Sequence, residues 1–218
     1  NIKDCLNKNK INYEKITRYS GRIIISTQNN CLCLRNVFGI SSFSPAIKIE
    51  LDIEKIKTIA LSLYTKGSFR ISCKRLNKNF NLSSEQVNRL LGEYVSKNKK
   101  AKVNLDKPNC NIGIEIMDYA YFFNQRYNCF GGLPVGVEGK VTLILENKKD
   151  LLAGILMLKR GCSLEIINKN NLNFNILDKY SYGSKIYEVN KPSDNSLAIV
   201  KTSSLENIKN KAYNKVIL

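Results

Sequence analysis

The stretch from residue 141 to residue 167 constrains the fold of this chain more than any other. Val141–Leu145 and Leu164–Ile167 are mostly apolar runs of strand length, and the segment 150–159 between them is apolar nearly all round. Gly161 follows that segment, as a glycine commonly follows the last turn of a helix. A buried strand, a buried helix and a second buried strand in this order predict a parallel sheet.

The rest of the C-terminal third continues this pattern. Short apolar runs predict further strands at 186–189, 197–200 and 216–218, and a helix at 204–212. We therefore expect an α/β domain with a small, doubly wound parallel sheet over residues 140–218. A glycine-rich segment, residues 131–139, precedes this domain and predicts a hinge loop.

Residues 51–130 predict a second unit. Apolar residues recur at helical spacing over 53–64, and residues 69–75 alternate between apolar and polar as in a half-buried strand. Another amphipathic helix begins at Ser83 or Ser84, either of which is a good N-cap. Two strands follow, at 112–117 and 120–126. The unit therefore has the order α–β–α–β–β.

Residues 1–50 predict a small α+β unit. A polar helix precedes a strand at Arg22–Ser26, a second helix covers 29–38 and ends at Gly39, and a strand at 41–50 is interrupted at Pro45. This order corresponds to a ferredoxin-like fold without its first strand. Because the missing strand would leave an unpaired edge, we expect it upstream of Asn1 or from a partner chain.

Charge is the strongest compositional signal. Lys and Arg number 35 against 18 acidic residues, a formal net charge of +17, which favours a polyanionic partner. A Lys-rich composition with solvated lysines on every face is the alternative. The chain has no apolar run long enough to cross a membrane. Seven cysteines without a C-x-x-C pair, and no His, predict buried free thiols in a reducing cytoplasm and no metal site.

Several short motifs resemble the tRNA 4-thiouridine synthetase (ThiI-type) family. They are Val37–Ile40 with Ser44–Ala46, Phe69–Arg75, Ser83–Arg89, Gly131–Gly136 and Met157–Gly161, in the family's order and spacing. The resemblance covers about residues 20–167, and more weakly 198–218. It implies a ferredoxin-like domain at 1–50, a THUMP RNA-binding domain at 51–130 and a PP-loop ATPase-like domain at 140–218.

The resemblance and the residues together predict an RNA-binding surface on the central unit. Basic residues cluster at the end of one strand, in the following loop and along the second helix, and such a cluster neutralises phosphates without reading sequence. The candidate residues are Lys74, Arg75, Lys78, Arg89, Lys97, Lys99 and Lys100. Cations also suit a helix C-terminus, so an ordinary solvated face is the alternative for the last three.

The glycine-rich loop has two interpretations. Gly131, Gly132, Pro134 and Gly136 either bring backbone N–H groups close to RNA or form a plain interdomain hinge. In the family this loop leads from the THUMP domain into the ATPase domain and lies near the RNA-binding face. Aromatic residues at 121–123 and Tyr127 offer base-stacking surfaces, but half of a strand's side chains must face the core.

The chain departs from the family pattern at the nucleotide-binding loop. The family has Ser-Gly-Gly-x-Asp-Ser between a buried strand and a helix, where glycine amides wrap the pyrophosphate. Here the residues are Glu146, Asn147, Lys148, Lys149 and Asp150, with neither glycine nor serine. The family's catalytic cysteine is also missing, because no Cys follows Cys162, and the segment after it is short. We expect a degenerate, truncated PP-loop domain with no cofactor.

The resemblance implies a tRNA-binding protein that recognises the acceptor 3′ end through its THUMP domain, and the departures at the nucleotide-binding loop predict that it has no thiolation activity of its own. An alternative is the RNA-binding subunit of a split 4-thiouridine enzyme whose catalytic loop lies on another chain. A general polyanion binder is a third interpretation. Family analogy also suggests a homodimer through the C-terminal sheet.

Overall fold

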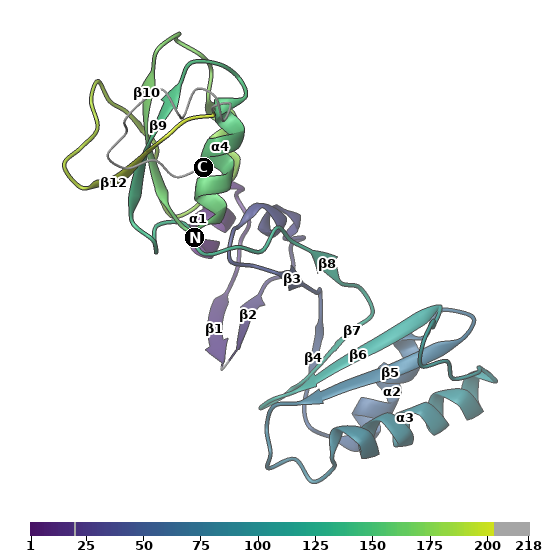
Figure 1. The fold of residues 1–218 in the computed structure, drawn as a ribbon. Helices are drawn as coiled ribbons and strands as arrows, with labels where there is room; N and C mark the ends of the chain where they lie inside the picture. The colour runs from purple at the N-terminus through teal and green to yellow at the C-terminus, as the bar shows by residue number, and fades with distance from the viewer. Residues whose placement is uncertain (20, 203–218) are drawn as a thin grey trace. The chain divides into compact units, whose positions relative to one another are not determined.

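The computed structural model describes residues 1–19 and 21–202. The predicted helix at 204–212 and strand at 216–218 lie outside these residues. The chain forms two compact units, one made of Asn1–Phe43 together with the chain from Asn128 onward, the other of Ser44–Tyr127. We call them unit 1 and unit 2 (Figure 1).

Unit 2 is built on a four-stranded sheet. The strand order is β4 (Ile47–Ile49), β7 (Ala120–Phe123), β6 (Cys110–Ile116) and β5 (Phe69–Arg75). β5 and β6 run parallel, whereas β7 is antiparallel to both β6 and β4. The order of elements over residues 53–123 agrees with the predicted α–β–α–β–β pattern.

Two helices cover one face of this sheet. α2 (Ile53–Leu63) begins at Asp52, whose carboxylate accepts the N–H groups of Glu54 and Lys55 at 2.9 Å. α3 (Ser84–Lys99) begins at Ser83, which forms a reciprocal capping box with Gln86. Apolar residues of both helices and of the strands make one buried core, and Figure 1 shows both helices on the same side of the sheet. The described residues place no helix on the opposite face.

Side chains of α3 also protect the outer edge of β5. Asn88 Oδ1 accepts the N–H of Cys73 at 2.8 Å, and Ser84 Oγ accepts the N–H of Arg75 at 3.0 Å. An edge strand with free N–H groups invites pairing with another chain. Here the helix supplies acceptors for two of these donors and is itself fixed against the strand.

The C-terminal part of unit 1 contains the predicted parallel sheet. The strand order is β11 (Tyr187–Glu188), β10 (Ser163–Asn168), β9 (Lys140–Leu145) and β12 (Ser196–Val200), and every pair is parallel. α4 (Asp150–Lys159) connects β9 to β10 and packs on both. Gly154 allows this close packing, because a Cβ there would lie 2.9 Å from a methyl group of Leu143. The fold class predicted for this segment is confirmed.

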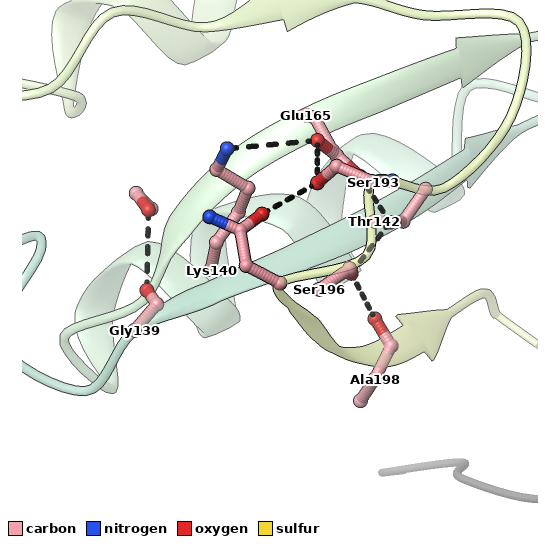
Figure 2. A network of polar contacts seen from close by, with 9 residues as sticks. Gly139, Lys140, Thr142, Glu165, Ser193, Ser196 and Ala198 are labelled. Carbon is pink, nitrogen blue, oxygen red and sulfur yellow. Dashed lines mark hydrogen bonds and ion pairs between the residues drawn. The ribbon is translucent and has the colours of Figure 1, made fainter.

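A buried carboxylate ties the segment before β12 to this sheet. Glu165 on β10 accepts hydrogen bonds from the Thr142 hydroxyl at 2.7 Å and from the N–H and hydroxyl of Ser193 at 2.8 and 2.7 Å (Figure 2). Lys140 Nζ lies 3.8 Å from the same carboxylate. Burial alone would raise the pKa of Glu165, but the hydrogen bonds and Lys140 outweigh it and hold the pKa below its usual value.

This network predicts a stability that depends on pH. Because the folded-state pKa of Glu165 is depressed, its contribution is present above the unfolded pKa, about 4.3, and is lost as the pH falls through the lower folded value. We expect Glu165→Gln to lower the free energy of unfolding by about 1–3 kcal/mol at neutral pH, with the difference from the native chain shrinking in acid. Denaturant unfolding at several pH values measures this. A constant difference, or an equal loss in the exposed control Glu188→Gln, contradicts the prediction.

The N-terminal segment of unit 1 differs from its prediction. After α1 (Ile2–Lys8), β1 (Lys15–Tyr19) pairs with β2 (Arg22–Ser26) in an antiparallel hairpin. The hairpin adds a strand at Lys15–Tyr19 that we did not predict, whereas the strand expected upstream of Asn1 or from another chain stays a prediction. The helix predicted over 29–38 is only a 3₁₀ helix, η1 (Leu32–Asn36).

The strand predicted over 41–50 is two separate strands. β3 (Ser42–Phe43) pairs with β8 (Tyr127–Asn128), whereas β4 joins the sheet of unit 2. Pro45 lies between them, and proline lacks the N–H that a continuous strand needs. As a result, unit 2 begins at Ser44 rather than at the predicted boundary after residue 50.

The glycine-rich segment 131–139 belongs to unit 1 and is held there by backbone hydrogen bonds. The N–H of Leu133 donates to Lys159 at the end of α4, and the N–H groups of Gly136 and Glu138 donate to Gly161. The chain passes between the units at 43–44 and 127–128. The hydrogen bonds hold the loop 131–139 against the end of α4, and its role as a hinge stays a prediction.

Candidate nucleic-acid interface

The predicted basic residues of unit 2 lie on three different parts of its surface. Lys74 is exposed on β5 and pairs in register with Glu115 of β6. Its neighbours Phe69, Ile71 and Cys73 contribute to the core beneath the helices, so strand alternation directs Lys74 to the opposite face. Lys78 is exposed in the loop between β5 and α3.

Arg75 is engaged within unit 2. Its guanidinium donates to the carbonyl oxygens of Phe80 at 2.9 Å and Leu82 at 3.3 Å, and the residue is half-buried. These contacts organise the loop that leads into α3. We therefore assign Arg75 to the support of this loop and leave it out of the proposed interface.

The remaining predicted cations lie on α3. Arg89 is well exposed, with 73% of its side chain accessible, and forms only a loose ion pair of 3.8 Å with Glu85 one turn earlier. Lys97, Lys99 and Lys100 are exposed at the C-terminal end, and Lys100 caps the helix in a left-handed conformation with φ of 51°. Exposed pairs of this kind contribute little to stability, so these cations are available to a polyanion.

The structure therefore does not gather the predicted residues into one patch. α3 has 16 residues and is about 24 Å long, so Lys78 near its start and Lys97–Lys100 at its end are separated by most of its length. The cations on α3 do not form a single row. Arg89 has the exposed Glu85 and Glu93 one turn away on either side, and Lys97 and Lys99 lie about 200° apart around the helix axis. Sequence reasoning missed Lys48 of β4, which lies exposed with its Nζ 3.7 Å from the centre of the Tyr119 ring.

The predicted glycine contacts are in unit 1, and the N–H groups of Gly131 and Gly136 have acceptors within the chain. Gly131 donates its N–H to Ile40, and Gly136 donates to Gly161. Gly132 has φ of 80° and a Cβ there would lie 2.3 Å from the carbonyl oxygen of Lys159, so a close packing contact explains this glycine. Pro134 is exposed and lies against Gly39.

The loop between β9 and α4 lies where the resemblance predicts a nucleotide-binding loop, and the side chain of Asp150 lies inside this loop. The Asp150 side chain is fully buried, and its Oδ2 accepts the N–H groups of Glu146 and Asn147 at 2.9 Å each. Its Oδ1 accepts the N–H of Thr202 at 3.1 Å. The backbone N–H groups that a phosphate would need are thus bound to a carboxylate of the same chain.

Two further contacts reinforce this arrangement. Glu146 forms an ion pair with Lys201 across the end of the sheet, which places a second carboxylate at the loop. Asn147 accepts the N–H of Lys149 at 2.9 Å. Lys148 and Lys149 are exposed and present charge to solvent without a surrounding set of amides.

Two cysteines, Cys5 and Cys73, have pKa values raised above the usual range of a thiol. Burial raises the pKa of Cys5 to about 12, with Cys33 adding to the effect, and burial raises the pKa of Cys73 to about 11. Thiols with such values stay protonated at neutral pH and are poor nucleophiles. Within residues 1–19 and 21–202 no three His, Cys, Asp or Glu side chains are placed to hold a metal ion, and no helix is long and apolar enough to span a membrane.

Comparison with known proteins agrees with this geometry. The THUMP domain model matches residues 50–122, which cover the two helices and most of the sheet of unit 2. The chain is therefore a THUMP-domain protein. Probable tRNA sulfurtransferases of Thermococcus kodakarensis and Mycoplasmopsis synoviae are 33% and 37% identical to it, over 85% and 77% of this chain and 55% and 44% of those proteins. It belongs to the ThiI-type tRNA sulfurtransferase family and spans about half the length of these relatives.

Solved structures show the same likeness. The crystal structure of PH1313 from Pyrococcus horikoshii superposes with a TM-score of 0.88 at 29% identity, covering 100% of this chain and 84% of that one. A 4-thiouridine synthetase–RNA complex with bound ATP gives a TM-score of 0.70 at 25% identity, covering 87% of this chain and 55% of that one. The predicted family is confirmed.

Proposed function

We propose that this chain binds tRNA at its acceptor end through the THUMP unit and performs no ATP-dependent thiolation of its own. The observation that carries the proposal is the set of exposed cations on α3, within the THUMP match. Arg89, Lys97 and Lys99 project from a helix that the core holds rigidly. The RNA in the similar 4-thiouridine synthetase complex supports RNA as the polyanion.

Binding of this kind depends mainly on phosphates. Lys and Arg that contact phosphates release condensed counterions, so affinity falls steeply with salt whatever the sequence. Preference for tRNA over other polyanions must then come from its shape and from its unpaired 3′ nucleotides. The helix α3 is rigid and presents charges at fixed positions, so it can match the shape of tRNA.

The second half of the proposal rests on the loop 146–150. A phosphate entering this loop would have to displace the buried Asp150 carboxylate from three backbone N–H groups and would meet Glu146 as well. Removing the acceptor of buried donors costs free energy, and the entering phosphates repel both carboxylates. We infer that this loop serves to join β9 to α4 and does not bind ATP.

Titration of intact tRNA and of duplex DNA of similar charge, each at two salt concentrations, tests the function. We expect tighter binding of tRNA by at least about tenfold at the higher salt, where bulk attraction is screened. Equal affinity with equal salt dependence would mean that the net charge of +17 alone drives binding, and would refute the proposed function.

A further inference from the structure

Three of the seven cysteines gather in unit 1, where α1 packs against η1. Cys5 lies on α1 and is fully buried, whereas Cys31 and Cys33 are half-buried at the start of η1. Both of these residues pack against the small apolar core that contains Cys5. The packing of α1 on η1 therefore brings together thiols that are far apart in the sequence.

Cys33 is the cysteine of η1 that contacts Cys5. The thiols of Cys5 and Cys33 share a side-chain hydrogen bond, so the two sulfur atoms are already neighbours in the reduced chain. Cys31 points its thiol to a different partner, the carbonyl oxygen of Asn29, at 3.6 Å. All three cysteines are free thiols in this structure.

The sulfur of Cys5 is also held in place from the other side. The side-chain amide of Asn9 donates to the Cys5 carbonyl oxygen at 2.8 Å, to the Tyr182 hydroxyl at 3.3 Å and more weakly to Cys5 Sγ at 3.9 Å. The Tyr182 hydroxyl in turn forms a hydrogen bond with the Cys5 thiol. Cys5 Sγ is thus fixed between Cys33, Tyr182 and Asn9, so it needs little movement to react with Cys33.

We propose that Cys5 and Cys33 form a reversible disulfide bond when the chain meets a small disulfide such as oxidised glutathione, and that this bond fastens α1 to η1. First, the Cys33 thiolate attacks one sulfur of oxidised glutathione, and one glutathione leaves as a thiolate. The Cys5 thiolate then attacks Cys33 Sγ in the mixed disulfide, and the second glutathione leaves. The leaving thiolates take up the two protons that the cysteines lose. Two cysteines are oxidised and one glutathione disulfide is reduced.

The exposure of the two cysteines assigns the order of these steps. Cys33 is half-buried and lies two residues before the exposed Arg35, so a small anionic disulfide can reach it. Cys5 is fully buried and cannot be reached from solvent. Burial also raises the pKa of Cys5 to about 12, which makes the second step slow. The step proceeds because Cys33 Sγ already lies beside Cys5, which gives a high effective concentration.

The bond would stabilise a part of unit 1 that has few other anchors. α1 has seven residues, and a helix this short does not persist without tertiary contacts. Asp4 accepts the N–H of Gly183 at 2.8 Å, and Asn1 donates to the Val135 carbonyl oxygen at 3.2 Å. A disulfide that closes a loop of about 30 residues restricts the unfolded chain and stabilises the folded one. Oxidation of the surroundings is therefore converted into a more stable unit 1.

The test incubates the full native chain with oxidised glutathione, blocks the remaining thiols with iodoacetamide and maps the peptides by mass spectrometry. We expect a peptide pair joined through Cys5 and Cys33, lighter than the two free peptides by two hydrogen atoms. The urea midpoint of unit 1 should rise by roughly 1 M. Dithiothreitol should reverse both changes.

Cys31→Ser is the matched control for Cys33→Ser. Both substitutions remove a half-buried thiol from the same end of η1. We expect the Cys31→Ser chain to form the cross-link and to show the same rise in the urea midpoint. The Cys33→Ser chain should show neither. The reduced variants and the reduced native chain should have the same circular dichroism, and if Cys33→Ser does not fold, the joined peptides of the native chain decide the question.

Three outcomes would overturn the inference. The first is a native chain that keeps the Cys5 thiol free after oxidation, even if Cys33 carries glutathione. The second is a disulfide that joins Cys31 to Cys33, or one chain to another, in place of the expected pair. The third is a Cys33→Ser chain whose urea midpoint still rises with oxidised glutathione. None of these measurements involves RNA, so they leave the proposed function untouched.

Discussion

Replacing Arg89, Lys97 and Lys99 together by glutamine should weaken binding of intact tRNA by roughly 100-fold. The three side chains project from α3, and each lost phosphate contact removes about 1 kcal/mol at an exposed site, where 1.4 kcal/mol corresponds to a factor of ten. The slope of log affinity against log salt should fall by about two to three, because each contact releases close to one counterion. Fluorescence anisotropy over a range of salt concentrations measures both quantities.

The control for this variant has the same net charge. Lys169, Lys179 and Lys191 are exposed lysines of unit 1, and their replacement by glutamine also removes three charges. If the account is right, this control loses less than about threefold in affinity. Equal losses in the two triple variants would show that position does not matter and that charge alone attracts the RNA.

Asp150→Ala should lower the free energy of unfolding of unit 1 by about 2–4 kcal/mol. The substitution leaves the N–H groups of Glu146, Asn147 and Thr202 without their acceptor, and each buried donor left unpaired costs about 1–3 kcal/mol. Water entering the loop offsets part of this loss, since the neighbouring residues are exposed. The Asp150→Ala substitution also removes a negative charge from the first turn of α4, where negative charge is favourable. Urea unfolding gives the value.

Asp178→Ala and Asp150→Asn complete this series. Asp178 is an exposed aspartate in the same unit, and its replacement should cost less than about 0.5 kcal/mol. Asparagine at 150 retains one oxygen for the Glu146 and Asn147 amides. The decrease in the free energy of unfolding for Asp150→Asn should therefore lie between those for Asp178→Ala and Asp150→Ala. If Asp150→Ala is no more destabilising than Asp178→Ala, Asp150 is not what holds this loop together.

The repeat of apolar residues correctly predicted those helices and strands whose local sequence pattern is enough to specify them. The helices of unit 2 and the strand 69–75 were correct because their apolar residues repeat with a single period, and Ser83 was correctly one of two proposed caps. The parallel sheet of unit 1 followed from apolar strands around an apolar helix. In each case local pattern and tertiary packing favour the same structure.

Elements set by pairing elsewhere in the chain could not be predicted in the same way. The hairpin strand Lys15–Tyr19 lies in a polar segment, and β4 belongs to a sheet whose other strands come from residues 69–123. The candidate site shows the same limit. Arg75 and Asp150 are polar residues at the expected positions, but their hydrogen bonds to loop carbonyls and loop amides depend on how those loops fold.

The central claim is that the THUMP unit recognises the 3′ end of tRNA. A comparison of the affinities for two RNAs tests this claim most directly. The native chain is titrated with intact tRNA and with the same tRNA lacking its terminal CCA, at physiological ionic strength. The account predicts that removal of CCA weakens binding by at least about tenfold, since phosphates of the stem remain but the unpaired nucleotides are gone. Equal affinity for the two RNAs would contradict it.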